Sequence, residues 1–480
     1  MNIIRKLIIK SSSFANAKKL RRKRMLVISL CLLLFLPQEL LAFSPYTNRE
    51  LDQLEKEFVE QINQAGNVIR DPLASQYINH LAEVLARNGQ LPQPYFFLVA
   101  SNEINAFAGP GGYIGINSQL ILASDSESEL AAVMAHEMAH VRLHHLYRMI
   151  EHQKQMRIPM LASMLAAIAL GVVNPAMGSG ALMAALSGFT QDNINFIRSN
   201  EKEADRIGID MLIKSGLNPL GMAGFFKKMQ QNARYFYTDN IPAILRTHPI
   251  DEDRIAEAEN RSLSLPKNAY TDSIDYHLFK ELIRNIVSGD SKRLLDFYGS
   301  TCRKSNTAIA CQYGHALTLI TLNRYHDANL KIDELLKQNP DNLYFIIAKS
   351  DVEIGLRLYD AAAKRLADLN LNYPENYAAI INYANSLIEA NKPNEAASIL
   401  LKGSRRFKND LIMCEHLARA ESASKRKDYA YFFEAQCQLL QGRKKEALRQ
   451  LNQAKSIAKS DHLIKARIDA KIDEIKASTM

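Results

Sequence analysis

Apolar residues recur at helical spacing along a stretch of the chain that begins at Ser126. They stand mostly three or four positions apart, at Leu130, Val133, Met134, Met138, Val141 and Leu146. Because an α-helix completes a turn every 3.6 residues, this spacing gathers them on one face. Ser126 precedes the run and Glu129 follows three residues later, an arrangement typical of a helix start. The pattern therefore predicts an amphipathic helix across residues 126–146.

Two apolar segments on either side of a glycine-rich turn predict strands. The first is the short run Tyr95–Ala100, and the second is Tyr113–Leu120, in which apolar and polar or small residues alternate. Between them lies the turn sequence Gly109–Gly112. We expect the second segment to form an edge strand, to which an extended polypeptide could add. The alternative is an ordinary strand inside a sheet.

A 34-residue period marks the C-terminal part of the chain. Small residues recur at this interval at Ala328, Ala362 and Ala396, and twelve positions earlier at Ala316, Ser350 and Ala384. Turn sequences at 340–342, 374–376 and 408–410 keep the same interval. Paired helices with small residues at their crossings and this period resemble the tetratricopeptide repeat, whose concave surfaces usually bind polypeptide. The period blurs beyond residue 411, and the alternative is an irregular helical bundle.

The N-terminal 42 residues have the layout of a secretory signal. Nine basic residues and no acidic residue occur in the first 24 positions. The apolar run Met25–Pro37 follows, and Ala42 offers a small-residue cleavage site. The run is short for a membrane span, which needs about 20 residues, although an uncleaved anchor is the alternative because Leu40 is not small. The segment predicts an exported protein.

Removal of this segment changes the charge and the cysteine count. It takes away nine positive charges and one negative charge, so the net charge falls from +9 to about +1. That balance predicts no nucleic-acid partner. The four remaining cysteines, Cys302, Cys311, Cys414 and Cys437, permit two disulfides in an exported chain, and three pairings are open.

The predicted helix at 126–146 carries the clearest chemical motif, H-E-x-x-H. His136 and His140 are four residues apart, so both imidazoles project from one face and can reach a single zinc ion. Glu137 between them can take a proton from water. The alternative is a pair of ordinary surface or core histidines, and a third ligand would decide between the two readings.

Residues 200–208, NEKEADRIG, supply that candidate. Glu201 and Asp205 lie one turn apart on a second predicted helix, which Gly216 ends. Glu-x-x-Ala-Asp about 60 residues after H-E-x-x-H is the pattern of one group of zinc peptidases. In that pattern the Glu is the third zinc ligand, and the Asp orients a ligand histidine. Glu203 is the rival ligand, but it projects from the other side of the helix.

The motifs HEMAH (136–140) and EKEAD (201–205), preceded by residues 105–121, resemble the HtpX and prenyl-protease-like zinc metallopeptidases. With the signal and the repeats, nearly all the mature chain resembles periplasmic protease-chaperones of this kind. The resemblance implies one zinc ion per chain, peptide hydrolysis in the periplasm, and quality control of outer-membrane β-barrel proteins. The implied partners are unfolded or misassembled outer-membrane proteins and, through the repeats, the β-barrel assembly machinery.

The same resemblance draws attention to His248, in THPIDEDR (247–254). If this histidine coordinates zinc, it displaces the catalytic water and the enzyme is latent, because catalytic zinc needs an open position. If it swings away, it could stabilise the developing oxyanion. The alternative is a loop histidine bonded to the surface. Arg254 could form an ion pair with a nearby acidic residue. We expect His144 and His145 either to be exposed to solvent or to contact the metal ligands from behind.

The segment from Ile158 to Gln191 contains no charged residue. Two membrane crossings would need about 40 residues and a turn, and glycines and Pro175 interrupt the 34 that are present. We therefore expect a helical hairpin that covers the active site or makes peripheral contact with a membrane surface. Two full spans are the alternative.

Together these patterns predict a mainly α chain. We expect a signal peptide at 1–42 and an α+β zinc metallopeptidase domain with a small sheet at 43–265. Connecting helices at 266–306 lead to an α-helical tetratricopeptide-repeat solenoid at 307–480. The predicted catalytic residues of the metallopeptidase domain are Glu137, Asp205 and His248, and its predicted metal ligands are His136, His140 and Glu201. The rival function is a chaperone or adaptor whose zinc site is latent or structural.

Overall fold

The computed structural model describes residues 48–89, 94–152, 177, 191–235, 242–263, 270–302, 308–458 and 461–477. The described residues, from Asn48 onward, form one compact unit. The predicted signal peptide lies outside the described residues, as does the uncharged segment 158–191 apart from Met177 and Gln191. Within the described ranges, no helix is both long and apolar enough to cross a membrane.

A four-stranded sheet forms the centre of the N-terminal half of the unit, with the strand order β1-β2-β4-β3. The strands are β1 (Val68–Ile69), β2 (Tyr95–Val99), β3 (Ala106–Ala108) and β4 (Tyr113–Asn117). β2 and β4 run parallel, with Phe97 opposite Gly115, and β3 pairs antiparallel with β4. Both predicted strands are confirmed, but the second ends at Asn117, before its predicted end at Leu120, because a short helix begins at Ser118.

The expected edge position of β4 is wrong, because β3 covers its free side and is itself the edge. Gly111 and Gly112 have φ of 70° and 80°, a backbone conformation that turns β3 back onto β4 at little cost for glycine. The sequence analysis did not predict β3, because a three-residue strand is too short to show an alternation of apolar and polar residues.

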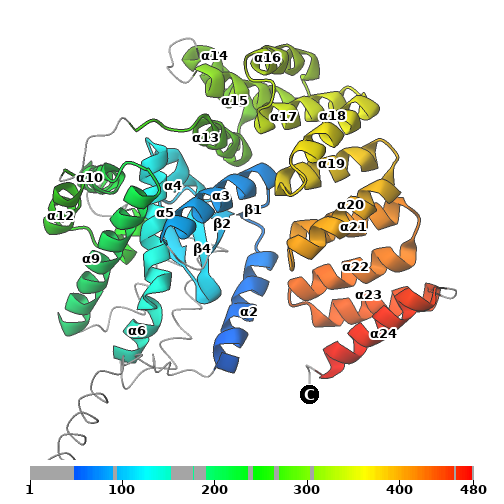
Figure 1. Ribbon diagram of the computed structural model, residues 1–480, viewed down its shortest axis with the longest axis horizontal. Coiled ribbons are helices and arrows are strands. Elements are labelled where there is room, and N and C mark those ends of the chain that lie inside the picture. Colours follow the sequence, from blue (N-terminus) through cyan, green and yellow to red (C-terminus); the bar gives the residue numbers. More distant parts are fainter. Residues whose placement is uncertain are drawn as a thin grey trace, which may run out of the picture. The chain divides into compact units, whose positions relative to one another are not determined.

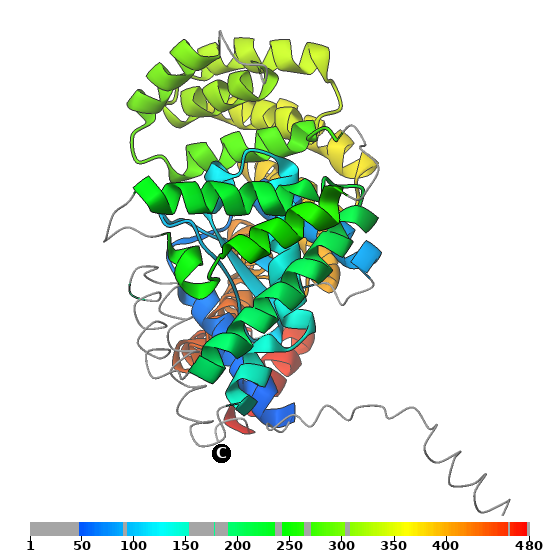
Figure 2. The same ribbon diagram turned by 90° about the vertical axis from the view of Figure 1, so that its left-hand side faces the viewer.

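Helices surround this sheet on both sides (Figure 1). The helices of this half are α2 (Asn48–Gln64), α3 (Pro72–Gly89), α4 (Ser118–Ala123), α5 (Glu127–Arg142), α6 (His145–His152), α9 (Gln191–Lys214), α10 (Leu220–Tyr235), α11 (Ala243–Thr247) and α12 (Glu252–Leu263). Figure 2 shows α9, α10 and α12, in green, crossing in front of α5. The helix that carries the H-E-x-x-H motif is therefore enclosed.

Antiparallel helices fill the rest of the chain from residue 274 onward. They are α13 (Ile274–Val287), α14 (Ser291–Thr301), α15 (Ala308–Thr321), α16 (Tyr325–Gln338), α17 (Leu343–Gly355), α18 (Tyr359–Asn372), α19 (Tyr377–Glu389), α20 (Pro393–Arg406), α21 (Leu411–Ala423), α22 (Lys427–Leu440), α23 (Lys444–Ile457) and α24 (His462–Ala477). Ala328, Ala362 and Ala396 are fully buried at the helix crossings, as the repeat pattern predicts.

Local backbone features repeat every 34 residues. Asn342, Asn376 and Asp410 each cap a helix by accepting hydrogen bonds from its first N–H groups. The turns inside the helix pairs each contain one residue with positive φ, at Asn323, Arg357, Asn391 and Lys425. The period therefore continues past residue 411, where the side-chain pattern had faded. The predicted helical solenoid is confirmed.

The four cysteines that follow the predicted signal peptide form two disulfides, each between neighbouring helices. Cys302 at the end of α14 pairs with Cys311 of α15, and Cys414 of α21 pairs with Cys437 of α22. Of the three pairings that the sequence left open, this one joins cysteines whose Cα atoms are 5.4 and 5.7 Å apart.

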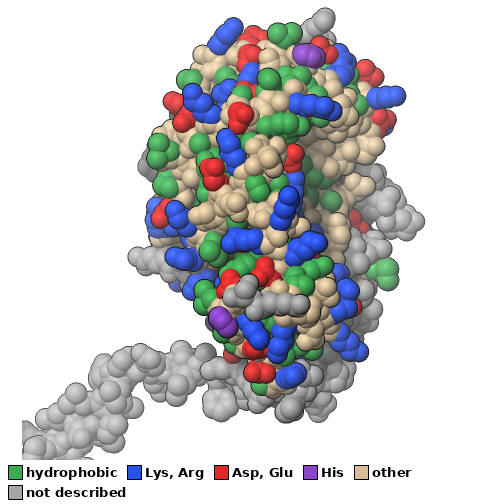
Figure 3. All heavy atoms as spheres, turned by 90° about the vertical axis from the view of Figure 1, so that its right-hand side faces the viewer, with side chains coloured by type: hydrophobic (Ala, Val, Ile, Leu, Met, Phe, Trp, Pro, Cys, Tyr) green, Lys and Arg blue, Asp and Glu red, His purple; other side chains and the backbone are tan. Residues whose placement is uncertain are grey.

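Charges of both signs are interspersed on the face formed by the repeats (Figure 3). Ion pairs also link successive repeats, as in Lys392–Asp360 at 2.9 Å and Arg406–Glu375 at 2.6 Å. Exposed ion pairs of this kind contribute only about 0–1 kcal/mol each. The repeats must therefore derive most of their stability from the buried side chains.

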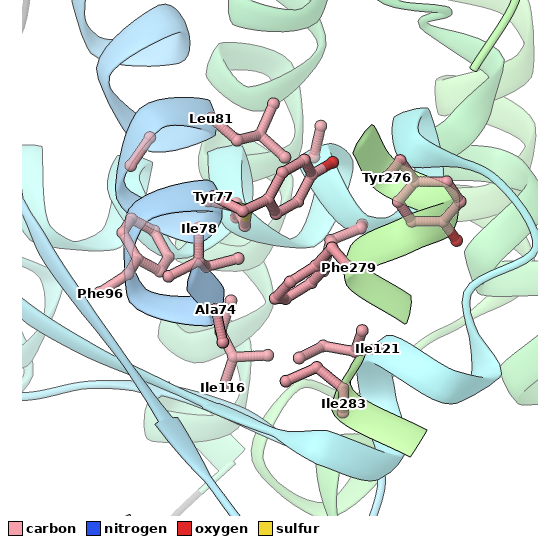
Figure 4. Packing of buried hydrophobic residues seen from close by; sticks show 14 of the residues in the cluster. Ala74, Tyr77, Ile78, Leu81, Phe96, Ile116, Ile121, Tyr276, Phe279 and Ile283 are labelled. Atoms are coloured by element: carbon pink, nitrogen blue, oxygen red, sulfur yellow. The ribbon is translucent and has the colours of Figure 1, made fainter. Parts of the chain in front are cut away.

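One hydrophobic core joins the repeats to the sheet-containing half. Figure 4 shows Tyr77 and Ile78 of α3 beside Phe279 and Ile283 of α13. The rings of Tyr77 and Phe279 stack with their centroids 4.3 Å apart. The same cluster continues to Ala378 of α19. Because each fully buried large apolar side chain contributes roughly 1.5–3 kcal/mol, this shared core holds helix α5 and the repeats in one unit.

Candidate metal centre

Helix α5 presents the H-E-x-x-H motif from the interior of the fold. It starts as predicted, because the Ser126 hydroxyl accepts a hydrogen bond from the Glu129 N–H at 3.1 Å. Residues 128–139 are all buried, and Glu137 is only 1% exposed. The helix ends at Arg142, earlier than predicted, because His144 adopts φ 53° and separates α5 from α6.

Helix α9 lies against α5 and brings two carboxylates to the motif. Glu201 and Asp205 are 3% and 5% exposed. One turn further along, a Cβ on Gly208 would lie 2.9 Å from Met222 Cε and 3.3 Å from the His136 backbone nitrogen. The missing side chain therefore permits the close approach of the two helices.

Four side chains, from the helices α5 and α9 and from the loop after α11, converge on one point. Their potential ligand atoms, on His136, His140, Glu201 and His248, all lie within 4.8 Å of one another. His136 Nε2 lies 2.9 Å from His140 Nε2 and 3.4 Å from Glu201 Oε2. His140 Nε2 lies 3.3 Å from Glu201 Oε1. The two nitrogen–oxygen spacings match the roughly 3.3–3.6 Å edges of a tetrahedron whose N and O ligands lie about 2.0–2.2 Å from a metal ion, and the two imidazole nitrogens lie somewhat closer together.

The chemistry of this donor set also fits a cation. Imidazole nitrogens and carboxylate oxygens that face one another at such distances bring lone pairs together. Burial alone would raise the pKa of Glu201, but His248 and His140 outweigh it and hold that pKa well below its usual range. Glu201 is therefore an anion in the interior, which suits a metal ligand.

The outer nitrogen of His136 is held by a carboxylate that is itself fixed. His136 Nδ1 lies 2.9 Å from Asp205 Oδ1. Arg254 donates to both oxygens of Asp205, from Nε at 2.7 Å and from Nη2 at 2.8 Å. Burial favours the neutral form of Asp205, yet the hydrogen bonds from His136 and Arg254 lower its pKa. The sequence suggested an acidic partner for Arg254 without identifying it.

Arg254 also connects the centre to the loop that carries His248. Its Nη1 donates to the Pro249 carbonyl at 2.6 Å and lies 3.0 Å from Glu201 Oε2. His248 follows α11 directly, and its backbone N–H donates to the Ile244 carbonyl. The guanidinium therefore bridges α9 and this loop.

His248 lies inside the cluster. Its Nδ1 is 3.1 Å from both Glu201 oxygens and 3.3 Å from His136 Nε2. Its Nε2 is 3.3 Å from Glu137 Oε1. Among the residues that the structure describes, that buried oxygen finds no hydrogen-bond partner of good geometry. Glu137 Oε1 is therefore an available proton acceptor beside the cluster.

Glu203, the alternative ligand in the sequence analysis, and His145 both lie behind the cluster. Glu203 turns away from Glu201 and contacts His145 and Arg148. The structure also separates the adjacent histidines, because His144 is exposed whereas His145 is 4% exposed and touches His140. The sequence could not distinguish them, since the distinction depends on the break between α5 and α6.

Comparisons with known proteins agree with this arrangement. Peptidase family M48 matches residues 72–262, which include the whole cluster. The beta-barrel assembly-enhancing protease of Escherichia coli (strain K12) is 34% identical over 428 residues, covering 88% of this chain and 87% of that protein. The protein of the same name from Yersinia pestis is 31% identical and covers 87% of each chain.

A shorter match involves metalloprotease LoiP of Escherichia coli (strain K12). It is 30% identical over 162 residues, which are 33% of this chain and 61% of that protein. The longer matches, in contrast, run through the metal centre and the repeats alike. The chain is a metallopeptidase of family M48, and it belongs to the beta-barrel assembly-enhancing proteases.

Proposed function

We propose that this protein is a zinc-dependent endopeptidase of the periplasm with chaperone-like activity. It degrades misassembled outer-membrane β-barrel proteins and assists the assembly of others. The convergence of four ligand atoms beside the buried Glu137 carboxylate is the observation that carries the peptidase activity. The name of the relatives supports the β-barrel substrates. The signal-like segment at 1–42 supports export.

His136, His140 and Glu201 are the proposed zinc ligands, with one ion per chain. Two imidazoles and one carboxylate form a set that zinc commonly uses in hydrolytic enzymes. When bound, zinc supplies Lewis-acid chemistry, in that it polarises a peptide carbonyl and lowers the pKa of water. Asp205 holds His136 through Nδ1, so that Nε2 keeps its lone pair directed into the cluster.

Glu137 is the proposed general base and acid. Its buried oxygen can take a proton from the attacking water and later deliver that proton to the leaving amine. Such a transfer needs an acceptor within hydrogen-bond reach of the reacting water, and Glu137 is next to His136 on α5.

His248 is the proposed plug of this site. In its present position it lies within 3.1–3.3 Å of Glu201 and His136 and occupies the space beside Glu137. Substrate entry would therefore require the loop after α11 to move. Once displaced, its imidazole could stabilise the oxyanion that develops on the substrate.

Two surfaces are proposed for polypeptide binding. The edge strand β3 packs beside α5, and an extended substrate could add to its free side. The repeats would recruit misassembled proteins or the β-barrel assembly machinery. Contact of 158–191 with a membrane surface stays a prediction.

The test compares zinc content and cleavage of an unfolded protein for wild type, Glu137→Gln and His248→Ala. We expect Glu137→Gln to retain one zinc while its cleavage rate falls at least about 100-fold, because the proton acceptor is lost. We expect His248→Ala to cleave faster than wild type. Cleavage at the wild-type rate by Glu137→Gln would refute the assignment.

A chaperone or adaptor with a latent metal site is the second candidate. The position of His248 inside the cluster favours it, since a fourth ligand closes a catalytic site. Full function of Glu137→Gln in cells, together with zinc binding but no cleavage by the wild type, would select this candidate.

A further inference from the structure

A chain of polar contacts extends from the back of His140 to the protein surface. His140 Nδ1 lies 2.8 Å from His145 Nδ1. The other ring nitrogen of His145, Nε2, lies 3.3 Å from Glu203 Oε2. Arg148 Nη1 donates to the same oxygen at 2.9 Å. His145, Glu203 and Arg148 take no part in the mechanism proposed above.

The break between α5 and α6 creates the first of these contacts. In an unbroken helix, residues five apart are rotated by about 140° and cannot face each other. His144 adopts φ 53°, which ends α5, and α6 begins at His145. The side chain of His145 can therefore fold back onto His140, and it is 4% exposed.

The contacts fix where each proton lies. His140 Nε2 points into the cluster, so it must offer a lone pair to a metal and the proton stands on Nδ1. His145 Nδ1 then accepts from His140, which leaves the proton of His145 on Nε2. That N–H points at Oε2 of the Glu203 carboxylate, and Arg148 donates a second hydrogen bond to the same oxygen. Donor and acceptor alternate along the whole chain.

A similar chain of contacts supports His136, but without an intervening histidine. There the carboxylate of Asp205 contacts the ligand histidine directly and Arg254 fixes the carboxylate. Glu203 stands two residues before Asp205, on another side of α9, and it meets His145 instead of His140. The imidazole of His145 connects the ligand to its carboxylate.

We propose that His145, held by Glu203 and Arg148, is a positioning residue for metal binding. It fixes the tautomer and the ring orientation of His140 and thereby raises the affinity of the centre for zinc. The inference rests on the proposed ligation by His140. It assigns a role to two residues, His145 and Glu203, that lie outside the ligand set.

The experiment measures the dissociation constant of Zn²⁺ for the full chain, by competition with a chromogenic chelator. We expect His145→Ala to weaken binding about 10–100-fold, the usual effect of removing the partner of a ligand histidine. His145→Gln should recover much of the affinity, because its amide offers one acceptor and one donor. The matched control is His144→Asn, at the adjacent exposed position, where asparagine tolerates positive φ. It should bind like wild type.

A second readout separates positioning from a merely structural role. The visible absorption bands of the Co²⁺-loaded chain report ligand geometry, and we expect them to change in His145→Ala and to return towards wild type in His145→Gln. A folded His145→Ala chain with wild-type zinc affinity and unchanged cobalt bands would overturn the proposal.

Further variants cover the case in which His145→Ala does not fold. The side chains of Glu203 and Arg148 are each 41% exposed, so Glu203→Gln and Arg148→Ala should leave the fold intact. We expect both to lose zinc affinity severalfold, and wild-type affinity in both would overturn the proposal. A wild-type chain that binds no zinc would instead refute the ligand set itself.

Discussion

Arg254 is the buried cation on which the acidic side of the metal centre depends. It is 2% exposed, contacts both oxygens of Asp205, and lies 3.0 Å from Glu201. Its guanidinium also lies 4.8 Å from the centre of the Phe226 ring, an attractive cation–π arrangement. The two carboxylates could not stay ionised in this interior without a compensating charge.

Replacement of Arg254 should therefore destabilise the chain strongly. We expect Arg254→Ala to lower the free energy of unfolding by about 3–5 kcal/mol, because Asp205 and Glu201 would be buried without their partner. The measurement is urea denaturation of the metal-free protein. Arg206→Ala is the matched control, since Arg206 pairs with Glu257 at a half-exposed site and should cost no more than about 1 kcal/mol. Equal losses in the two variants would contradict this account.

At the scale of elements, local signals predicted what local physics controls. The serine cap and apolar spacing located the start of α5, and Gly216, with φ 72°, follows α9 as its position predicted. The predicted edge position of β4 was wrong, and the sequence left the role of His145 undecided. Both outcomes have the same cause. Both depend on how the chain turns between elements, at Gly111–Gly112 and at His144, and on contacts with segments remote in sequence.

The close packing of α5 and α9 can be tested with two glycines. We expect Gly208→Ala to lower the free energy of unfolding by about 1–3 kcal/mol, because its Cβ would crowd Met222 and the backbone of His136. Gly299→Ala, in helix α14, meets no atom within 4 Å and should raise stability by about 0.5–1 kcal/mol. Urea denaturation of both variants is the check. A gain in stability for Gly208→Ala would show that α9 has room to move away.

For the molecule as a whole, the helical repeats and the sheet-containing half meet through polar groups as well as through the shared core. Asn63 Nδ2 of α2 donates to the Leu440 carbonyl at 2.9 Å, and Gln76 of α3 accepts from the Tyr377 N–H at 3.0 Å. No local pattern could predict these contacts, since about 300 or more residues separate each pair. Near this junction a carboxyl of α17, Asp351, lies close enough to Asp71 for each charge to affect the other.

Asp351 should make the stability of the unit depend on pH. Burial, with a smaller contribution from Asp71, raises the pKa of Asp351 to about 7 from an ordinary value of 3.8. Between these values the folded chain keeps a proton that the unfolded chain has lost, so this group lowers stability as the pH rises towards 7. Asp351→Asn removes the charge. It should stabilise the protein by roughly 2–3 kcal/mol more at pH 8 than at pH 5, measured by urea denaturation. Asp368→Asn, on the exposed side of α18, is the control for loss of one charge. An equal gain for Asp351→Asn at both pH values would mean that the folded chain holds this carboxyl ionised, and that the junction tolerates two neighbouring charges.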